Sequence, residues 1–159
     1  MAQSAASLPV PPKTLSAGEV SLRFVGIVPG EPARGLVPSY KFLVVAADGS
    51  EVGHINFRVG DTEHVRVCAG HIGFGIQKTF RGHGYALQAC RAIAPFVFSV
   101  YDAVIITCDP DNEASRRTIE RLGASFIDEV AVPAHDPHYQ SGSRRKRRYQ
   151  WKAEHPSSC

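Results

Sequence analysis

The first half of the chain is patterned for β-strands, because apolar and polar residues alternate along it. Asp48-Gly49 is a hairpin turn signal between two of these runs. Glycine at Gly70 breaks a later run and predicts a bulge or an interruption. The pattern predicts three strands that form an antiparallel meander, followed by a fourth interrupted strand, over residues 20–28, 40–46, 51–59 and 65–77.

From Tyr85 onward the apolar positions recur with helical spacing, which predicts an amphipathic helix lying on the sheet. Pro95 falls inside this helix. Proline removes a backbone hydrogen bond at a cost of about 3 kcal/mol, so we expect a kink or an early end there. Residues 103–108 are apolar without alternation, which indicates a strand buried on both faces.

The last third of the chain predicts a short helix and two further strands. Asp111 and Asn112 are candidate N-caps for a helix over residues 113–122, and Gly123 is a stop signal. Strands are expected over residues 125–132 and 147–152. A strand-helix-strand unit within an antiparallel set predicts an α/β (α+β) fold, with a mixed, mostly antiparallel sheet of about six or seven strands and helices packed on it.

The composition adds that the chain is one globular domain. It has 159 residues, of which 43% are hydrophobic and 21% charged. Residues 1–18 are small, polar and proline-containing, so we expect a flexible tail, a domain over 19–153 and a second tail over 154–159. We find neither a long apolar run nor a signal-peptide pattern, and the four cysteines lack disulfide-framework spacing. We therefore expect a cytoplasmic protein with reduced thiols and no membrane contact.

The net charge of +3 has a local origin. Five of the 18 Lys and Arg residues form the run 144–148, and without it the balance against 15 acidic residues is −2. A dedicated nucleic-acid binder needs a basic face, so nucleic acid is not the expected partner. The run either binds an acidic partner such as ribosomal RNA or protects the edge of the last strand.

The segment with the clearest chemical character joins the fourth strand to the first helix. Gly82 and Gly84 expose bare backbone, and the helix start adds unpaired N–H groups and partial positive charge. Arg81 can add a charge-assisted contact to phosphate oxygens. This is an anion-binding arrangement, although its spacing matches neither a Walker A loop nor GxGxxG.

Two motifs then resemble one family. Arg81-x-x-Gly84-x-Ala86 resembles the pyrophosphate loop of the GNAT superfamily of N-acetyltransferases, and Asn112-x-x-Ser115 with Leu122-Gly123 resembles its following helix. The motifs occur in the family's order and spacing, and the resemblance covers residues 20–152. The chain is most similar to the branch that contains ribosomal-protein alanine acetyltransferases.

The resemblance implies a sheet that splays between the fourth strand and the strand over 103–108, leaving a slot for acetyl-CoA as co-substrate. Pantetheine would pair with the backbone of Phe74, Gly75 and Ile76. Asn112 and Ser115 would lie on the far wall of the slot. The pyrophosphate would rest on the amides of Arg81, Gly82, His83, Gly84, Tyr85 and Ala86.

Within that family, the acceptor is a primary amine, which must lose a proton before it attacks. Deprotonation at pH 7 costs an α-amine, with a pKa near 8, less than a lysine-like amine with a pKa of about 10.4. A protein N-terminus and a small-molecule amine both fit, and the sequence leaves a homodimer open. His54 and Asn56 share one face of the third strand, where either an acceptor cavity or solvent explains them.

The catalytic residues are less well marked than the loop. Family members often use a glutamate acting through water and a tyrosine that protonates the thiolate, but Ile119 stands at the tyrosine position. Ser115 is the candidate replacement for the acid, or a helix-terminal serine. Glu63 and His71 are candidates for the base, although a solvated loop charge and a strand histidine explain them equally.

Three alternatives accompany this interpretation. His64, Cys68 and His71 lack zinc-type spacing with a fourth ligand, so we expect no metal. The departure at Ile119 keeps a catalytically silent CoA-binding module in consideration. An RNA- or ribosome-associated protein is the third alternative, and it depends on the run 144–148 alone.

Overall fold

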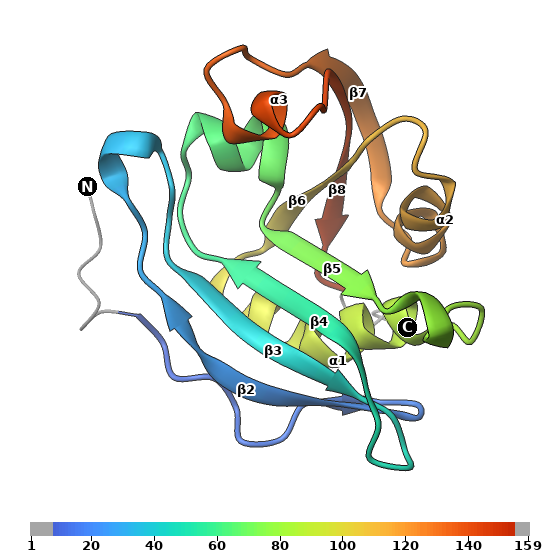
Figure 1. The fold of residues 1–159 in the computed structure, drawn as a ribbon. Helices are drawn as coiled ribbons and strands as arrows, with labels where there is room; N and C mark the ends of the chain where they lie inside the picture. The colour runs from blue at the N-terminus through green and yellow to red at the C-terminus, as the bar shows by residue number, and fades with distance from the viewer. Residues whose placement is uncertain (1–7, 155–159) are drawn as a thin grey trace, which may run out of the picture.

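The computed structural model describes residues 8–154, which form one open eight-stranded sheet flanked by helices (Figure 1). The strand order is β1-β2-β3-β4-β5-β6-β8-β7. The strands are β1 Ser16–Ala17, β2 Val20–Val28, β3 Ser39–Val45, β4 Glu51–Arg58, β5 Ile72–Ile76, β6 Ala103–Cys108, β7 Ser125–Ala131 and β8 Arg145–Lys152. The helices and helical turns are η2 Pro32–Arg34, η3 His64–Ala69, η4 Lys78–Phe80, α1 Tyr85–Val100, α2 Glu113–Arg121 and α3 Pro137–Gln140.

The predicted meander and mixed sheet are confirmed. Strands β2, β3 and β4 pair antiparallel in chain order, and β5 adds antiparallel to β4. The parallel step is between β5 and β6, where the register contains only Ile72 opposite Ile106. Beyond this pair the two strands diverge, so the sheet is splayed at its middle.

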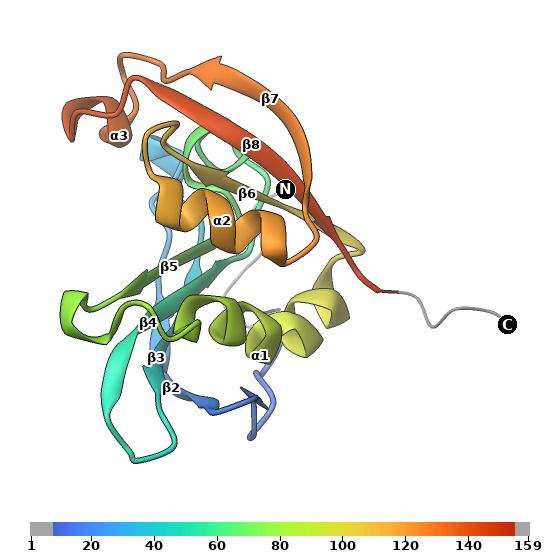
Figure 2. The same ribbon diagram turned by 90° about the vertical axis from the view of Figure 1, so that its right-hand side faces the viewer.

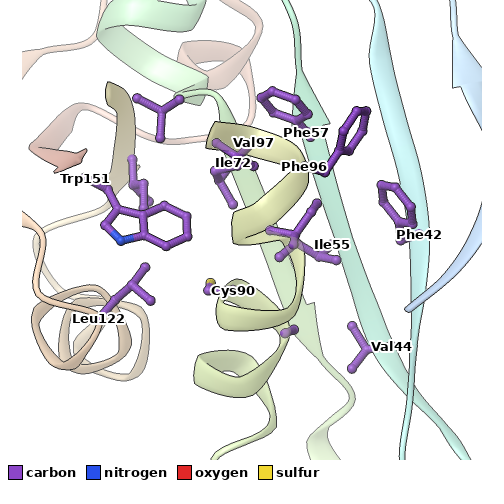
Figure 3. Close-up of a cluster of buried hydrophobic side chains, with 14 of the residues drawn as sticks. Phe42, Val44, Ile55, Phe57, Ile72, Cys90, Phe96, Val97, Leu122 and Trp151 are labelled. Carbon is purple, nitrogen blue, oxygen red and sulfur yellow. The ribbon is translucent and has the colours of Figure 1, made fainter. Parts of the chain in front are cut away.

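The core lies between the sheet and α1 (Figure 3). Phe96 of α1 packs against Tyr40 and Phe57, with ring centroids 4.9 and 5.4 Å apart. Cys90 and Val97 are also fully buried on the sheet-facing side of the helix. This burial places the apolar face of α1 where the helical spacing predicted it.

A kink or an early end of α1 was expected at Pro95, and the early end is wrong. The helix continues to Val100. Phe96 and Val97, directly after the proline, are buried against the sheet. Their burial offsets the missing backbone bond, because burying a large apolar side chain contributes roughly 1.5–3 kcal/mol.

The prediction of a strand through residues 65–69 is also wrong, because these residues form the π-helix η3. Val65, Cys68 and Ala69 are its buried residues, and their spacing of three and one is helical rather than alternating. Gly70 ends η3 with a φ of 69°, and a Cβ there would lie 2.8 Å from the carbonyl oxygen of Ile105. Only residues from Ile72 onward pair in the sheet.

The N-terminal boundary of the domain also differs from the expectation. Residues 8–18 contain β1, which pairs with β2, and Leu15 is buried in the core. The prediction of a flexible tail up to residue 18 is therefore wrong for this part. Residues 1–7 and 155–159, which include Cys159, lie outside the described residues.

Strand β6 is buried less completely than its apolar sequence predicts. Val104, Ile106 and Cys108 are buried, whereas the alternate residues of β6 are only partly buried. The prediction of burial on both faces is therefore wrong, because β6 is fully buried on one face only. Cys68, Cys90 and Cys108 are free thiols. Within residues 8–154, no helix combines the length and apolar character needed to cross a bilayer.

Candidate active site

A cavity of about 460 Å³ opens where β5 and β6 diverge, between the start of α1 and one side of α2. Figure 2 shows α1 and α2 on the side of the molecule where the two strands separate. The cavity is lined by Phe74, Gly75, Ile76, Phe80, Arg81, Gly82, Gly84, Tyr85, Ala86, Leu87, Asn112, Ala114, Ser115, Arg117, Thr118 and Arg121. We call this cavity the slot.

The predicted binding residues converge on the slot with one exception. Residues 74–76, 81, 82, 84–86, 112 and 115 line it. His83 does not line it, and its exposed ring lies 5.5 Å from the ring of Tyr85. Because the side chain of His83 points elsewhere, only its backbone can serve the loop.

The loop before α1 presents backbone N–H groups to the slot. Gly82 and Gly84 have φ values of 90° and 75°, a region that favours glycine. Gly84 is the N-cap of α1, and no side chain caps the helix there. The first amides of an α-helix have no acceptor within the helix, so this end of α1 keeps unpaired donors and partial positive charge.

The opposite wall of the slot is fixed by the N-cap of α2. Asn112 Oδ1 accepts a hydrogen bond of 3.1 Å from the backbone N–H of Ser115, which confirms Asn112 as the cap. The Ser115 hydroxyl forms no hydrogen bond with the described residues, so it is available to a group in the slot.

The charged residues of the slot are all basic. Arg81, Arg117 and Arg121 line it, and no aspartate or glutamate does. Arg81 Nε also donates to the carbonyl oxygen of Ile76, 3.1 Å away, which ties the loop to the end of β5. Arg117 and Arg121 were missed by the sequence analysis. Their signal was the spacing of residues 114, 117, 118 and 121, which places them on one face of α2.

The candidate bases Glu63 and His71 lie outside the slot. Glu63 is largely exposed, and its carboxylate contacts His135 Nε2 at 3.2 Å. His71 is buried, and its Nδ1 accepts a hydrogen bond of 3.0 Å from the N–H of Ile105. Burial lowers the pKa of His71, so its imidazole is held neutral. This hydrogen bond connects the start of β5 to β6, which gives His71 a structural role.

A second polar cluster joins α3 to η3. Asp136 Oδ2 contacts His64 Nδ1 at 2.7 Å, and a ring nitrogen of His138 lies within 4.8 Å of both. Burial alone would raise the pKa of Asp136, but hydrogen bonds from His64 and from the N–H of His138 hold it below its usual value. The pKa of His138 is lowered to about 4 by burial and by the charges of Lys146 and Arg58.

All five residues of the basic run 144–148 make contacts within the protein. Arg145 and Arg148 pair with Glu129 and Asp128, and the buried Lys146 pairs with Asp109. The remaining members of the run, Arg144 and Arg147, lie over the aromatic rings of Tyr139 and Phe126. The edge-protecting interpretation of the run is nevertheless wrong, because β8, which contains residues 145–148, pairs with β6 on one side and with β7 on the other and is not an edge strand.

Comparison with protein families decides the class. The family model of the acetyltransferase (GNAT) domain matches residues 6–125. The chain belongs to the GNAT acetyltransferase family. The resemblance carried by the two sequence motifs is thereby confirmed, and the slot of this GNAT chain lies between those two motifs. No curated protein sequence matches the chain.

Solved structures share the fold of this GNAT chain at low identity. A GNAT-family acetyltransferase from Bacillus anthracis is 24% identical with a TM-score of 0.57, over 70% of this chain and 65% of that one. The microcin C7 self-immunity acetyltransferase MccE, in complex with acetyl-CoA and AMP, is 18% identical with a TM-score of 0.54, over 72% and 61%. The ribosomal-protein-S5-alanine acetyltransferase from Vibrio fischeri is 16% identical with a TM-score of 0.55, over 72% and 61%. This chain thus matches less than two thirds of the length of these relatives.

Proposed function

We propose that the protein is an N-acetyltransferase that moves an acetyl group from acetyl-CoA to a primary amine. The observation that carries the proposal is the slot, where the unpaired edge of β5 meets the uncapped start of α1. An unpaired strand edge can pair with the amides of a pantetheine arm. A helix start flanked by arginines can hold a diphosphate. Relatives with the same fold include MccE in complex with acetyl-CoA.

In the proposed reaction the amine nitrogen attacks the thioester carbonyl carbon, forming the C–N bond as the C–S bond breaks. The ammonium of the acceptor first loses a proton to water. The nitrogen loses its second proton to water on attack, and the sulfur leaves with the bonding electrons and gains a proton from a hydroxyl that water then reprotonates. We assign Ser115 to this last transfer, because its hydroxyl lines the slot and has no competing partner in the described residues.

Direct transfer is favoured over a cysteine intermediate. Cys68, Cys90 and Cys108 are buried and do not line the slot. Burial raises the pKa of Cys68 and Cys90 to about 12, so neither provides a thiolate near neutral pH. These reduced thiols also support a cytoplasmic location, which we include in the proposal.

The acceptor is a small-molecule amine or a protein N-terminus. One experiment tests the proposal: thiol release from acetyl-CoA is measured over a panel of amines and N-terminal peptides, together with the melting temperature with and without CoA. Acetylated product with CoA-dependent stabilisation supports the proposal. Stabilisation by CoA without thiol release on any amine indicates a silent CoA-binding module. Absence of stabilisation overturns the assignment of the slot.

A further inference from the structure

The face of the sheet that points away from α1 is uncovered beside the slot. In β4, Ile55 and Phe57 are buried on the α1 side, so His54, Asn56 and Arg58 lie on the other side. Figure 1 views this other face, and α1 lies behind it. Among residues 8–154, no helix lies over β3, β4 and β5 on this side.

Two glycines leave the backbone of β5 bare on this face. Gly73 lies opposite Asn56, and Gly75 lies opposite His54. A Cβ on Gly73 would lie 3.0 Å from Arg58 Nη1, and one on Gly75 would lie 2.8 Å from His54 Cε1. The side chains of Arg58 and His54 therefore rest directly on the strand that forms the edge of the slot.

The basic side chains of this face have no anionic partner within residues 8–154. Arg58 is partly buried and Nη1 donates to the carbonyl oxygens of Ala69 and Gly70, while Nη2 has no acceptor among the described residues. The ion pairs of residues 8–154 include neither Arg58, His54 nor Lys41, which lies opposite Asn56. Removing a guanidinium from water without a carboxylate partner costs free energy, and a bound anion reduces this cost.

The charged groups that approach from neighbouring elements do not neutralise this face. Asp136 is bonded to His64, and Asp109 is bonded to Lys146. Glu51, at the far end of β4, pairs with Arg23. Each of these carboxylates is already engaged, so the positive charge around Arg58 is available to a ligand.

We propose that the acceptor is an amine carrying an oxyanion, a carboxylate or a phosphate, close to its nitrogen, and that Arg58 with Lys41 and His54 binds this oxyanion. The inference rests on the proposed acetyl transfer. An oxyanion held over Gly73 places the attached amine at the edge of β5, where the thioester arm of acetyl-CoA is proposed to lie. A guanidinium suits this task because its parallel donors match a carboxylate or phosphate. An α-amino acid has such a carboxylate, whereas a polyamine or a peptide N-terminus has none beside its amine.

The test compares matched acceptors on the full chain with saturating acetyl-CoA. L-amino acids are compared with their α-amides, and phosphoethanolamine with ethanolamine, by kcat/KM for thiol release. The amine of an amino-acid amide is the easier to deprotonate, so basicity alone favours the amide. We expect kcat/KM to be about tenfold or more higher for the anionic member of at least one pair, the scale of one charge-assisted contact. The pair that responds separates carboxylate from phosphate.

Variants then assign the preference to Arg58. Arg58→Gln and Lys41→Gln are expected to reduce the ratio of kcat/KM between the anionic and neutral acceptors by about fivefold or more. Arg91→Gln, at an exposed position of α1, is the matched control and should leave the ratio unchanged. Lys41 is exposed and serves as the second variant if Arg58→Gln fails to fold.

The outcomes are distinct for the two proposals. Equal or better use of the neutral acceptors, or a ratio unaffected by both variants, overturns the anionic-acceptor inference while acetyl transfer stands. Absence of thiol release with every acceptor overturns the proposed transferase function and the inference with it.

Discussion

Across the point where β5 and β6 separate, His71 Nδ1 accepts a hydrogen bond from the backbone N–H of Ile105, and the N–H of His71 donates to the carbonyl oxygen of Ile105 at 2.7 Å. Both bonds lie immediately to one side of the single β5–β6 residue pair, Ile72 with Ile106. His71 thus connects β5 to β6 at the point where the two strands begin to separate. The slot lies beyond this point, where the strands are no longer paired.

Replacing His71 with Phe should destabilise the fold more than it impairs proton transfer. The N–H of Ile105 would be left without an acceptor in a partly buried site, which costs up to about 1–3 kcal/mol of unfolding free energy. Urea denaturation measures this loss. If His71→Phe instead removes turnover while the unfolding free energy stays unchanged, His71 acts as the base.

The loop before α1 is tested by Gly84→Val. A β-branched residue is strained at a φ of 75° and adds bulk where amides face the slot. We expect CoA affinity to fall by about tenfold or more, the scale of one lost charge-assisted contact. Isothermal titration with CoA measures the change.

Gly49→Val is the matched control for Gly84→Val. Gly49 lies in the β3–β4 hairpin with a φ of 90° and open space around it, so valine adds comparable backbone strain far from the slot. Both variants should melt at lower temperature, and only Gly84→Val should bind CoA more weakly. Equal affinities in the two variants would remove the loop from the binding site.

Ser115→Ala separates catalysis from binding. The N-cap bond of α2 uses the backbone N–H of Ser115, which alanine keeps, so the helix start should persist. We expect kcat to fall by roughly tenfold to a hundredfold, the low end of general-acid effects, with unchanged CoA affinity. Ser99→Ala is the control, because its hydroxyl bonds only to Phe96 O within α1. Unchanged kcat in Ser115→Ala would refute the assignment of the acid.

Protonation of His138 should destabilise the protein in mild acid. Its pKa is about 4 in the fold, against an ordinary value of 6.5, so the unfolded chain binds a proton first as pH falls. The contribution of His138 to stability is therefore complete above pH 6.5 and is lost between pH 6.5 and 4. The pKa values of Asp136 and Asp109 are lowered from 3.8, so the stability that these two carboxylates contribute is lost only at lower pH.

Melting temperatures between pH 7.5 and 4.5 check this pH dependence. His138→Gln should flatten the decline, because glutamine does not titrate. His135→Gln, at a largely exposed position of the same loop, should keep the full decline. A decline of the same size in His138→Gln would assign it to other groups.

The sequence predicted the parts of the fold in which local signals agree with tertiary packing. The glycines at Gly82 and Gly84, the cap at Asn112 and the alternation in β4 each determine local structure directly, so the loop, α2 and the meander were predicted correctly. The errors lie where packing overrides local preference. Burial of Phe96 carries α1 past Pro95, and burial of Val65 and Cys68 winds η3 where a strand was expected.

The candidate site divides in the same way. Binding residues on the loop and on α2 follow from consecutive motifs, and nearly all of them line the slot. Glu63 and His71 were selected by residue type and approximate position, and their orientation depends on η3, which the sequence analysis took for a strand. Arg58 was not singled out, because its significance depends on the glycines of a neighbouring strand and on its lack of a carboxylate partner in the part of the chain that the structure describes.

The splayed sheet divides the molecule into two lobes, and between them the strand pairing consists of a single residue pair, Ile72 with Ile106. One lobe contains β1 to β5 with α1, and the other contains β6 to β8 with α2. A molecule that contacts both walls of the slot would hold the two lobes in one relative position, in addition to the packing of Phe98 of α1 against Trp151 of β8. Ligand binding would thus reduce local opening of the structure in residues beyond those that the ligand contacts.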